Sequence, residues 1–168
     1  MGNQTGTSIR DEGSGNPGAR NVGRVFGKKA FALVLVIDAF KGALAVLVVI
    51  WINGSPVIQL LALLAVMLGH CYPFVHRFKG GKGAATFIGG LLAFNPLLII
   101  PIVLCFAVLY LIVKRFTAVS VLATVSIIPC MGWLHNDITV LVAIVIVGLL
   151  LWTHRAAFHF TKERNQAI

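Results

Sequence analysis

The sequence predicts an all-α fold, a polytopic bundle of transmembrane helices. Hydrophobic residues make up 58% of the 168 and charged residues only 11%, and the mean hydropathy is +0.94. A soluble domain of this length turns a large part of its surface to water, so it cannot bury so many apolar side chains. The apolar residues also form long runs rather than alternating with polar ones, which argues against a transmembrane β-barrel.

Five apolar stretches each have about the length needed to cross a bilayer. A hydrocarbon core of roughly 30 Å requires about 20 residues at 1.5 Å per helical residue. The stretches are Phe31–Ile52, Val57–Phe74, Leu97–Val113, Ala118–Leu134 and Ile138–Thr153. We expect a membrane-spanning helix over each of them.

A sixth segment, residues 83–94, is shorter and contains a Gly-Gly pair. Its length is compatible with a full span that has a polar entry, or with a broken or re-entrant helix inside the bundle. The positive charges favour the full span. With six crossings, the inner segments 1–30, 76–82, 114–117 and 154–168 hold thirteen of the fourteen lysines and arginines, and the outer loops hold none. By the positive-inside rule, this distribution predicts six spans with both termini in the cytoplasm.

This topology divides the chain into three parts. Residues 1–30 are expected to form a glycine-rich basic cytoplasmic segment, residues 31–153 the helical bundle with a cytoplasmic loop at 76–83, and residues 154–168 a cytoplasmic tail. We expect the protein in the plasma membrane, with its functional site on the cytoplasmic face. The net charge of +9 is dispersed between apolar runs, which indicates contact with membrane lipids rather than nucleic acid. The three cysteines have no paired spacing, so no metal or disulfide is expected.

A polar loop precedes the first span. It combines three glycines, two short polar side chains and two arginines, namely Gly13, Ser14, Gly15, Asn16, Gly18, Arg20 and Arg24. Glycine permits positive φ, and successive turn amides can form a concave nest for an anion beside the arginines. The alternative interpretation is a flexible tail.

A second glycine-rich loop opens the sixth segment with the sequence Lys79-Gly80-Gly81-Lys82-Gly83. Glycine amides, a helix N-terminus and two lysines together favour an anion site. The loop is not a Walker motif, because His76 lies six residues before Lys82 where that motif has glycine. The alternative interpretation is a basic turn that only fixes topology.

Three further polar features lie at the ends or inside the spans. Asp38 and Lys41 are three residues apart and share a helix face, where they can serve architecture or function. His70 is interpreted as a hydrogen-bonding residue at a helix end. His154-Arg155 is either a place where a cation can meet a phosphate or an ordinary anchor at the membrane interface. Together these features indicate a phosphorylated ligand at the cytoplasmic surface. The sequence shows no pattern typical of a Ser-His-Asp triad or of paired catalytic carboxylates.

Three motifs in order carry a resemblance to a known family. They are Gly13-Ser-Gly-Asn-Pro-Gly-Ala with Asn21-Val, then Asp38 with Lys41-Gly42, then Gly69-His with Phe78-Lys-Gly-Gly-Lys-Gly-Ala-Ala-Thr86. The chain resembles the bacterial acyl-phosphate:glycerol-3-phosphate acyltransferases from about Ser8 to Glu163. The resemblance implies a seven-helix membrane enzyme that transfers a fatty acyl group from acyl phosphate to the 1-hydroxyl of glycerol 3-phosphate. The products would be lysophosphatidic acid and phosphate, at the start of phospholipid synthesis, with no metal or other cofactor.

The resemblance also implies roles for individual residues. The catalytic candidates are Ser14, Asn16, Arg24 and Lys82, with Lys82 on a phosphate. The substrate-binding candidates are Gly13, Gly15, Asn21, Lys79, Gly80, Gly81, Gly83 and His154, with His154 holding glycerol 3-phosphate. The general base stays open, because the resemblance allows a substrate phosphate to take the proton.

The chain departs from the family pattern at several places. Members usually have a further transmembrane helix before the first motif, and only Met1–Thr7 precede Ser8 here. Arg20 stands in place of threonine, Ala157 in place of asparagine and Phe160 in place of arginine. Ala118 stands in place of a serine, and the sequence leaves open whether Ser120 substitutes for it. These changes predict altered kinetics, altered substrate preference or lost activity. The alternatives are an impaired paralogue that only binds phosphorylated metabolites or acidic lipids, and a transporter of an organic phosphate.

Overall fold

The computed structural model describes residues 8–135 and 137–158, and every regular element in them is helical. The longer helices are α2 (Ala19–Phe26), α3 (Lys28–Trp51), α4 (Pro56–Cys71), α5 (Ala84–Phe94), α6 (Ile99–Val113), α7 (Phe116–Ala123), α8 (Ile127–Leu134) and α9 (Asp137–Thr153). Four 3-10 turns complete the described chain, namely η1 (Phe74–His76), η2 (Pro96–Leu98), η3 (Thr124–Ser126) and η4 (Arg155–Ala157). The predicted all-α fold is confirmed.

The surface of the bundle is apolar over long stretches. Lys28–Trp51, Pro96–Val113 and Phe116–Leu134 are long and apolar enough to cross a membrane, and three shorter apolar helices accompany them. Large side chains on these helices are strongly exposed, among them Trp51, Leu111 and Trp133 at 84%, 77% and 87%. Such a continuous apolar surface is stable against lipid rather than water.

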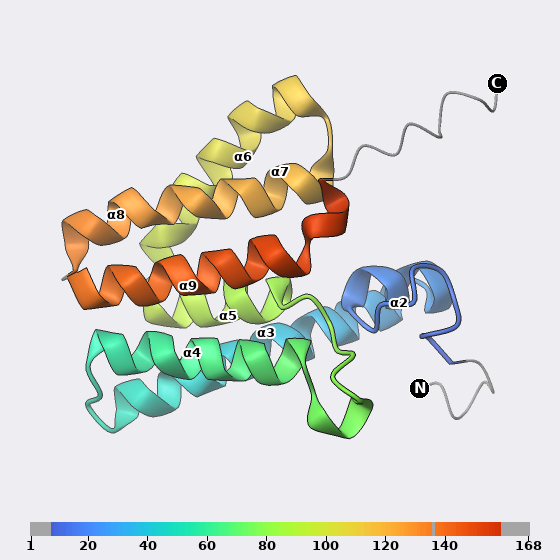
Figure 1. Cartoon of the computed structure of the whole chain (residues 1–168), viewed down its shortest axis with the longest axis horizontal. Helices are drawn as coiled ribbons and strands as arrows, with labels where there is room; N and C mark the ends of the chain where they lie inside the picture. The colour runs from blue at the N-terminus through green and yellow to red at the C-terminus, as the bar shows by residue number, and fades with distance from the viewer. Residues whose placement is uncertain (1–7, 136, 159–168) are drawn as a thin grey trace.

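The helices run alternately in opposite directions, so their connections collect at two ends of the bundle (Figure 1). One end, on the right in Figure 1, carries α2, the loop between α4 and α5, the turn between α6 and α7, and η4. These are the segments in which the sequence concentrates its positive charge. The basic segments therefore lie at one end of the molecule.

Helix α5 is shorter than the predicted full span. Its 11 residues extend over roughly 16 Å, about half of a hydrocarbon core. Most of the helix lies against α3 and α4, with Phe87, Gly89 and Gly90 buried. The helix is short and buried, and it still runs in the direction opposite to α4 and α6, as a sixth crossing requires (Figure 1).

Small residues bring α3 and α5 into close contact. A Cβ atom on Gly42 of α3 would overlap the carbonyl oxygen of Thr86, and a Cβ on Gly89 of α5 would overlap that of Ala39. Close approach of backbones through glycine is a common way for transmembrane helices to associate. The contact fixes α5 and thereby the glycine-rich loop that precedes it.

We expect Gly42→Ala to lower the thermal unfolding midpoint of the detergent-solubilised protein. The added methyl group overpacks the contact with Thr86, which costs about 1–3 kcal/mol. Gly148→Ala in α9 is the matched control, because a Cβ there meets no atom within 4 Å and alanine favours a helix. Equal midpoints for the two variants would show that α3 and α5 can move apart to accommodate the methyl group at little cost.

The predicted span Ala118–Leu134 is a helix interrupted by η3. Pro129 in α8 has no N–H to donate to the carbonyl of Val125, and its ring crowds that carbonyl. The Thr124 and Ser126 hydroxyls donate to the carbonyls of Val121 and Ala123, at 2.6 and 2.7 Å. Such bonds to the preceding turn accompany bends in helices, so the span is one helix with a local 3-10 turn.

Candidate active site

A cavity of about 1000 Å³ opens at the basic end of the bundle. It brings together side chains from both glycine-rich loops, from α2 and from the end of α9. Among its lining residues are the predicted site residues Ser14, Asn16, Asn21, Arg24, Lys82, Gly83 and His154. The structure thus joins the two loops that the sequence assigned to one phosphorylated ligand.

A second polar cavity, of about 650 Å³, adjoins the first. The two share Ser14, Asn16 and Lys82. The second adds the predicted residues Gly15, Lys79, Gly80 and Gly81, together with Arg10 and Arg155. Lys82 therefore lies at the boundary of two cavities that both carry cations.

Asn21 organises the first loop from inside. Its side chain is buried, with only 4% exposed. The Oδ1 atom accepts from the N–H of Ser14 at 2.9 Å, and Nδ2 donates to the carbonyls of Glu12 and Ile9 at 2.9 and 3.3 Å. Gly13 has a φ of +61°, and a Cβ there would overlap Asn21 Oδ1. Asn21 and Gly13 therefore position Ser14 and Asn16.

Three N–H groups of this loop are paired within the fold, which limits the backbone nest that the sequence predicts. The N–H of Ser14 donates to Asn21, that of Gly15 to the carbonyl of Glu12, and that of Gly18 to Asn16 Oδ1. The loop and α2 line the cavity with Ser14, Asn16, Arg20 and Arg24, while these three N–H groups are used within the fold.

The N–H groups of Gly80 and Gly81 are also paired within the fold, so they are not free to bind an anion. Their N–H groups donate to the carbonyls of Cys71 and His70, at 3.0 and 3.1 Å. These carbonyls belong to the last turn of α4, where the helix itself offers no donors. A Cβ on Gly81 would overlap the His70 ring, and one on Gly80 would overlap the carbonyl of His70. The two glycines close the end of α4 and are required there by space.

In the second glycine-rich loop, the groups that remain available to bind an anion are the Lys82 side chain and the first N–H groups of α5. The first N–H groups of a helix have no partner within it, and its dipole places positive potential there. Gly83, Ala84 and Ala85 line the larger cavity at this point. The carbonyl of Lys82 accepts from Thr153 Oγ1 at 2.9 Å, which fixes the loop to the end of α9.

His154 is buried, with 5% exposed, and its ring is oriented by the helix before it. Nδ1 lies 3.0 Å from the carbonyl of Leu150, so Nδ1 carries the proton and donates to it. Burial lowers the pKa of His154 below its ordinary 6.5. The hydrogen bond to Leu150 raises this pKa and the nearby Lys82 lowers it, and the net shift is downward. The imidazole is therefore neutral at pH 7, and the positive charge expected at 154–155 lies on Arg155.

We expect protonation of His154 to destabilise the fold at acid pH. Because its pKa is lower in the folded than in the unfolded chain, stability is retained above about pH 6.5 and lost as the pH falls through the lowered pKa. The thermal midpoint of the wild type should fall more steeply between about pH 7 and 5 than that of His154→Gln. Thr153→Val is the control, since it changes the same turn without removing the titrating group. Identical slopes for wild type and His154→Gln would contradict this assignment.

The predicted pair of Asp38 and Lys41 is formed. Lys41 Nζ lies 2.7 Å from Asp38 Oδ1, and His70 Nδ1 lies 3.6 Å from the same oxygen. Asp38 is buried, and together with His70 it lines the larger cavity. The pair neutralises a carboxylate inside the bundle. The contact of Asp38 with His70 links the middle of α3 to the end of α4.

The departures from the family pattern fall in different surroundings. Arg20 and Ala157 line the larger cavity, whereas Ala118 is buried. The Ser120 hydroxyl donates to the carbonyl of Thr117 at 3.1 Å, so it is used within its own helix. Phe160 lies outside the described residues.

Several site contacts were not anticipated from the sequence. Arg10 Nη2 donates to the carbonyl of Lys79 at 3.2 Å and joins the two loops, and Thr153 joins Lys82 to α9. Arg20 donates to Thr117 Oγ1 across 97 positions of the chain. No local spacing marks these residues, because each partner lies on a different segment.

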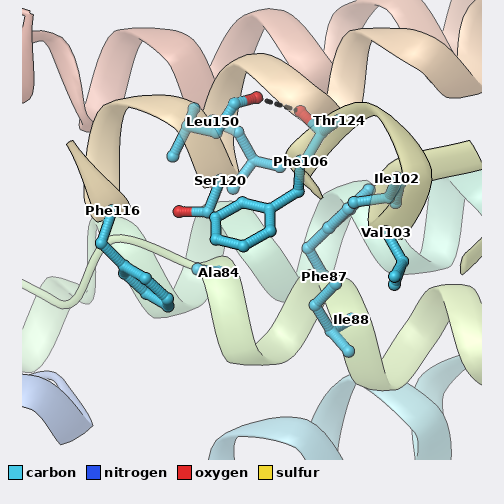
Figure 2. Close-up of a pocket in the computed structure, with 11 residues that line it drawn as sticks. Ala84, Phe87, Ile88, Ile102, Val103, Phe106, Phe116, Ser120, Thr124 and Leu150 are labelled. Carbon is cyan, nitrogen blue, oxygen red and sulfur yellow. Dashed lines mark hydrogen bonds between the residues drawn. The ribbon is translucent and has the colours of Figure 1, made fainter. Parts of the chain in front are cut away.

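An apolar pocket of about 240 Å³ lies beside the polar cavity, between α5, α6, α7 and α9. The two share Ala84 and Phe116. Figure 2 shows Phe106 across the middle of this pocket, with Phe116 on one side and Ile102 and Val103 on the other. A cation-lined cavity thus continues into an apolar pocket within the bundle.

Comparison with known sequences gives one consistent result. Residues 2–161 match the family described as glycerol-3-phosphate acyltransferase. Glycerol-3-phosphate acyltransferase 1 of Bacillus cereus (strain ATCC 10987 / NRS 248) is 45% identical over 148 residues, which cover 88% of this chain and 81% of that protein. Glycerol-3-phosphate acyltransferase of Paraburkholderia phytofirmans is 41% identical over 152 residues, or 87% and 71% of the two chains.

Two solved structures are similar to the fold. Both are of PlsY (YgiH), an integral membrane glycerol 3-phosphate acyltransferase, in its glycerol 3-phosphate form and its lysophosphatidic acid form. The first has a TM-score of 0.81 at 34% identity and covers 93% of this chain and 79% of that one. The second has a TM-score of 0.75 at 34% identity, with coverages of 86% and 75%.

Proposed function

This chain belongs to the glycerol-3-phosphate acyltransferase family, and from that premise we propose that it uses acyl phosphate as its acyl donor. It is a membrane enzyme that acylates glycerol 3-phosphate. In the proposed reaction the 1-hydroxyl oxygen bonds to the acyl carbon, and the bond from that carbon to the phosphate oxygen breaks. Phosphate leaves with the electron pair, and the hydroxyl proton passes to a substrate phosphate. The products are lysophosphatidic acid and inorganic phosphate.

The observation that carries this proposal is the junction of the two cavities. The polar cavity offers Arg24 and Lys82 to phosphate groups. The apolar pocket that begins at Ala84 and Phe116 offers space for a hydrocarbon chain. A donor with an anionic head and an apolar tail fits a polar cavity that adjoins an apolar pocket. Its acyl carbon then lies near the start of α5.

The residues suit a reaction that depends on positioning and charge. Acyl phosphate is a mixed anhydride with a good leaving group, so its cleavage needs little acid catalysis. Both substrates are anions, and the main barrier is to bring them together and to stabilise the tetrahedral oxyanion. Lys82 and the N-terminus of α5 supply positive potential for this, while Asn21 and Gly13 hold Ser14 and Asn16 in place.

The decisive experiment measures phosphate release by the purified chain. Release from acyl phosphate that requires glycerol 3-phosphate, and is matched by lysophosphatidic acid, supports the proposal. Binding of both ligands without release supports a non-catalytic membrane protein instead. Glycerol 3-phosphate uptake into proteoliposomes without acylation supports the transporter.

We further propose six crossings of the plasma membrane, with the site on the cytoplasmic side. The support is the location of the basic segments at one end of the bundle (Figure 1) and the positive-inside rule. In a background with the native cysteines replaced, Ser55→Cys on intact cells should react with a membrane-impermeant thiol reagent. Val75→Cys, with 85% of the native side chain exposed, should react only after lysis. The reverse pattern would invert the orientation.

A further inference from the structure

Phe116 lies at the junction between the polar cavity and the apolar pocket and lines both. It is the first residue of α7, and 57% of it is exposed. Its ring stands edge-on to Phe106 and Tyr110 of α6, with centroids 5.4 and 6.5 Å away. Phe106 and Tyr110 are themselves stacked, at 5.3 Å. One side of the Phe116 ring is therefore supported by an aromatic cluster.

Arg20 holds Phe116 from the α2 side. The guanidinium carbon lies 5.7 Å from the centroid of the Phe116 ring, within the range of a cation–π contact. The same guanidinium donates from Nη1 to the hydroxyl of Thr117. A planar guanidinium can meet a ring and a hydroxyl acceptor together, which an ammonium does less well. Arg20 thus ties α2 to the first two residues of α7.

The pocket beyond Phe116 presents apolar walls. Its two hydroxyl-bearing residues, Ser120 and Thr124, donate to the carbonyls of Thr117 and Val121 within their own helix. Such a pocket discriminates between ligands by the shape and length of an apolar chain. Because Phe116 lies at its entrance, the position of this ring bears on which chains enter.

We propose that Arg20 is a specificity-determining positioning residue that holds Phe116 through Thr117 and the cation–π contact, and thereby selects the acyl chain. The inference rests on the proposed function, in which the donor places its phosphate in the polar cavity and its chain in the apolar pocket. Arg20 acts through Phe116, and its effect is on the acyl donor rather than on glycerol 3-phosphate.

The first test compares kinetics with acyl phosphates of increasing chain length. For Arg20→Ala and Thr117→Val, we expect the ratio of kcat/KM between long and short chains to change by about tenfold. The KM for glycerol 3-phosphate should stay unchanged in Thr117→Val, which keeps the cation. The double variant should behave like Arg20→Ala, because Arg20→Ala already removes the contact that Thr117→Val breaks. Arg20→Lys should restore little of the wild-type chain-length preference, because an ammonium does not meet the ring and the hydroxyl together as well as a guanidinium does. Lys29→Ala is the control, because this exposed cation lines neither cavity.

The second test does not depend on catalysis. Ser120 is replaced by cysteine in the pocket, in a background with Cys71, Cys105 and Cys130 replaced by alanine. The rate of its reaction with alkyl methanethiosulfonates of different lengths reports how freely a chain enters. We expect Arg20→Ala and Thr117→Val to raise the rate for long reagents by about tenfold, and Lys29→Ala to leave it unchanged.

The outcomes separate the inference from the proposed function. If wild type releases no phosphate from any acyl phosphate, the proposed function fails, and the labelling rates still decide whether Arg20 controls entry. If Arg20→Ala weakens all chain lengths equally while Thr117→Val behaves as wild type, Arg20 binds phosphate directly and the inference is overturned. Unchanged chain-length profiles and labelling rates in both variants would overturn it too.

Discussion

Lys82→Ala should lower turnover by about 10²–10³-fold, which is the scale of losing one preorganised electrostatic group in a transition state. Lys82 lies where both polar cavities meet, beside the N-terminus of α5. Its side chain is therefore placed to neutralise phosphate charge as the two anionic substrates approach. Lys82→Arg should recover little, because a planar fork does not replace a compact ammonium beside a glycine loop.

The fold of the Lys82→Ala variant should be preserved. The contact that fixes this residue to α9 is made by its carbonyl oxygen with Thr153, and substitution of the side chain leaves it in place. The measurement is phosphate release at saturating substrates, with the thermal midpoint as a check on folding. Lys28→Ala removes an exposed cation at the start of α3 and is the control. Near-normal turnover in folded Lys82→Ala would reduce Lys82 to a topology signal.

The helices could be predicted because hydrophobic runs and breakers act locally. Asn95 and Pro96 mark the end of one helix and the start of the next, where Asn95 Oδ1 accepts from the N–H of Leu97 at 3.0 Å. The Asp38–Lys41 pair was also predictable, since three residues on a helix place two side chains on one face. The length of α5 was less certain, because charge counting gives the number of crossings rather than the length of each helix.

The internal design of the site could not be predicted, because it depends on contacts between distant segments. The motif around Gly80 and Gly81 predicts an anion site that includes their amides, yet these amides donate to the carbonyls of Cys71 and His70 at the end of α4. Only the folded loop shows that these carbonyls lie within reach. Similarly, the sequence shows Arg20 only as a replacement of the family's threonine at a binding site. Its contacts with Thr117 and Phe116 are visible only in the structure.

Asn21→Ala should lower kcat/KM by about one to three orders of magnitude while the helical bundle remains folded. The variant loses three hydrogen bonds that hold residues 9–14 around α2. Each is worth about 0.5–1.5 kcal/mol, and about 1.4 kcal/mol corresponds to a factor of ten. Ser14 and Asn16 then lose their fixed place at the boundary of the two polar cavities. The substrates must order the loop themselves, which weakens transition-state binding.

Gly13→Ala should reproduce this loss by a different route, since its Cβ would displace Asn21 Oδ1 and its φ of +61° disfavours alanine. The double variant should be little worse than either single one, because both disrupt one contact. Gln59→Ala is a matched control: Gln59 Nε2 donates to the carbonyl of Gly54 at 3.0 Å and holds a turn at the opposite end of the bundle. It should lower the thermal midpoint without lowering turnover of the folded protein. Equal turnover in Asn21→Ala and Gln59→Ala would mean that the first loop needs no internal support to act.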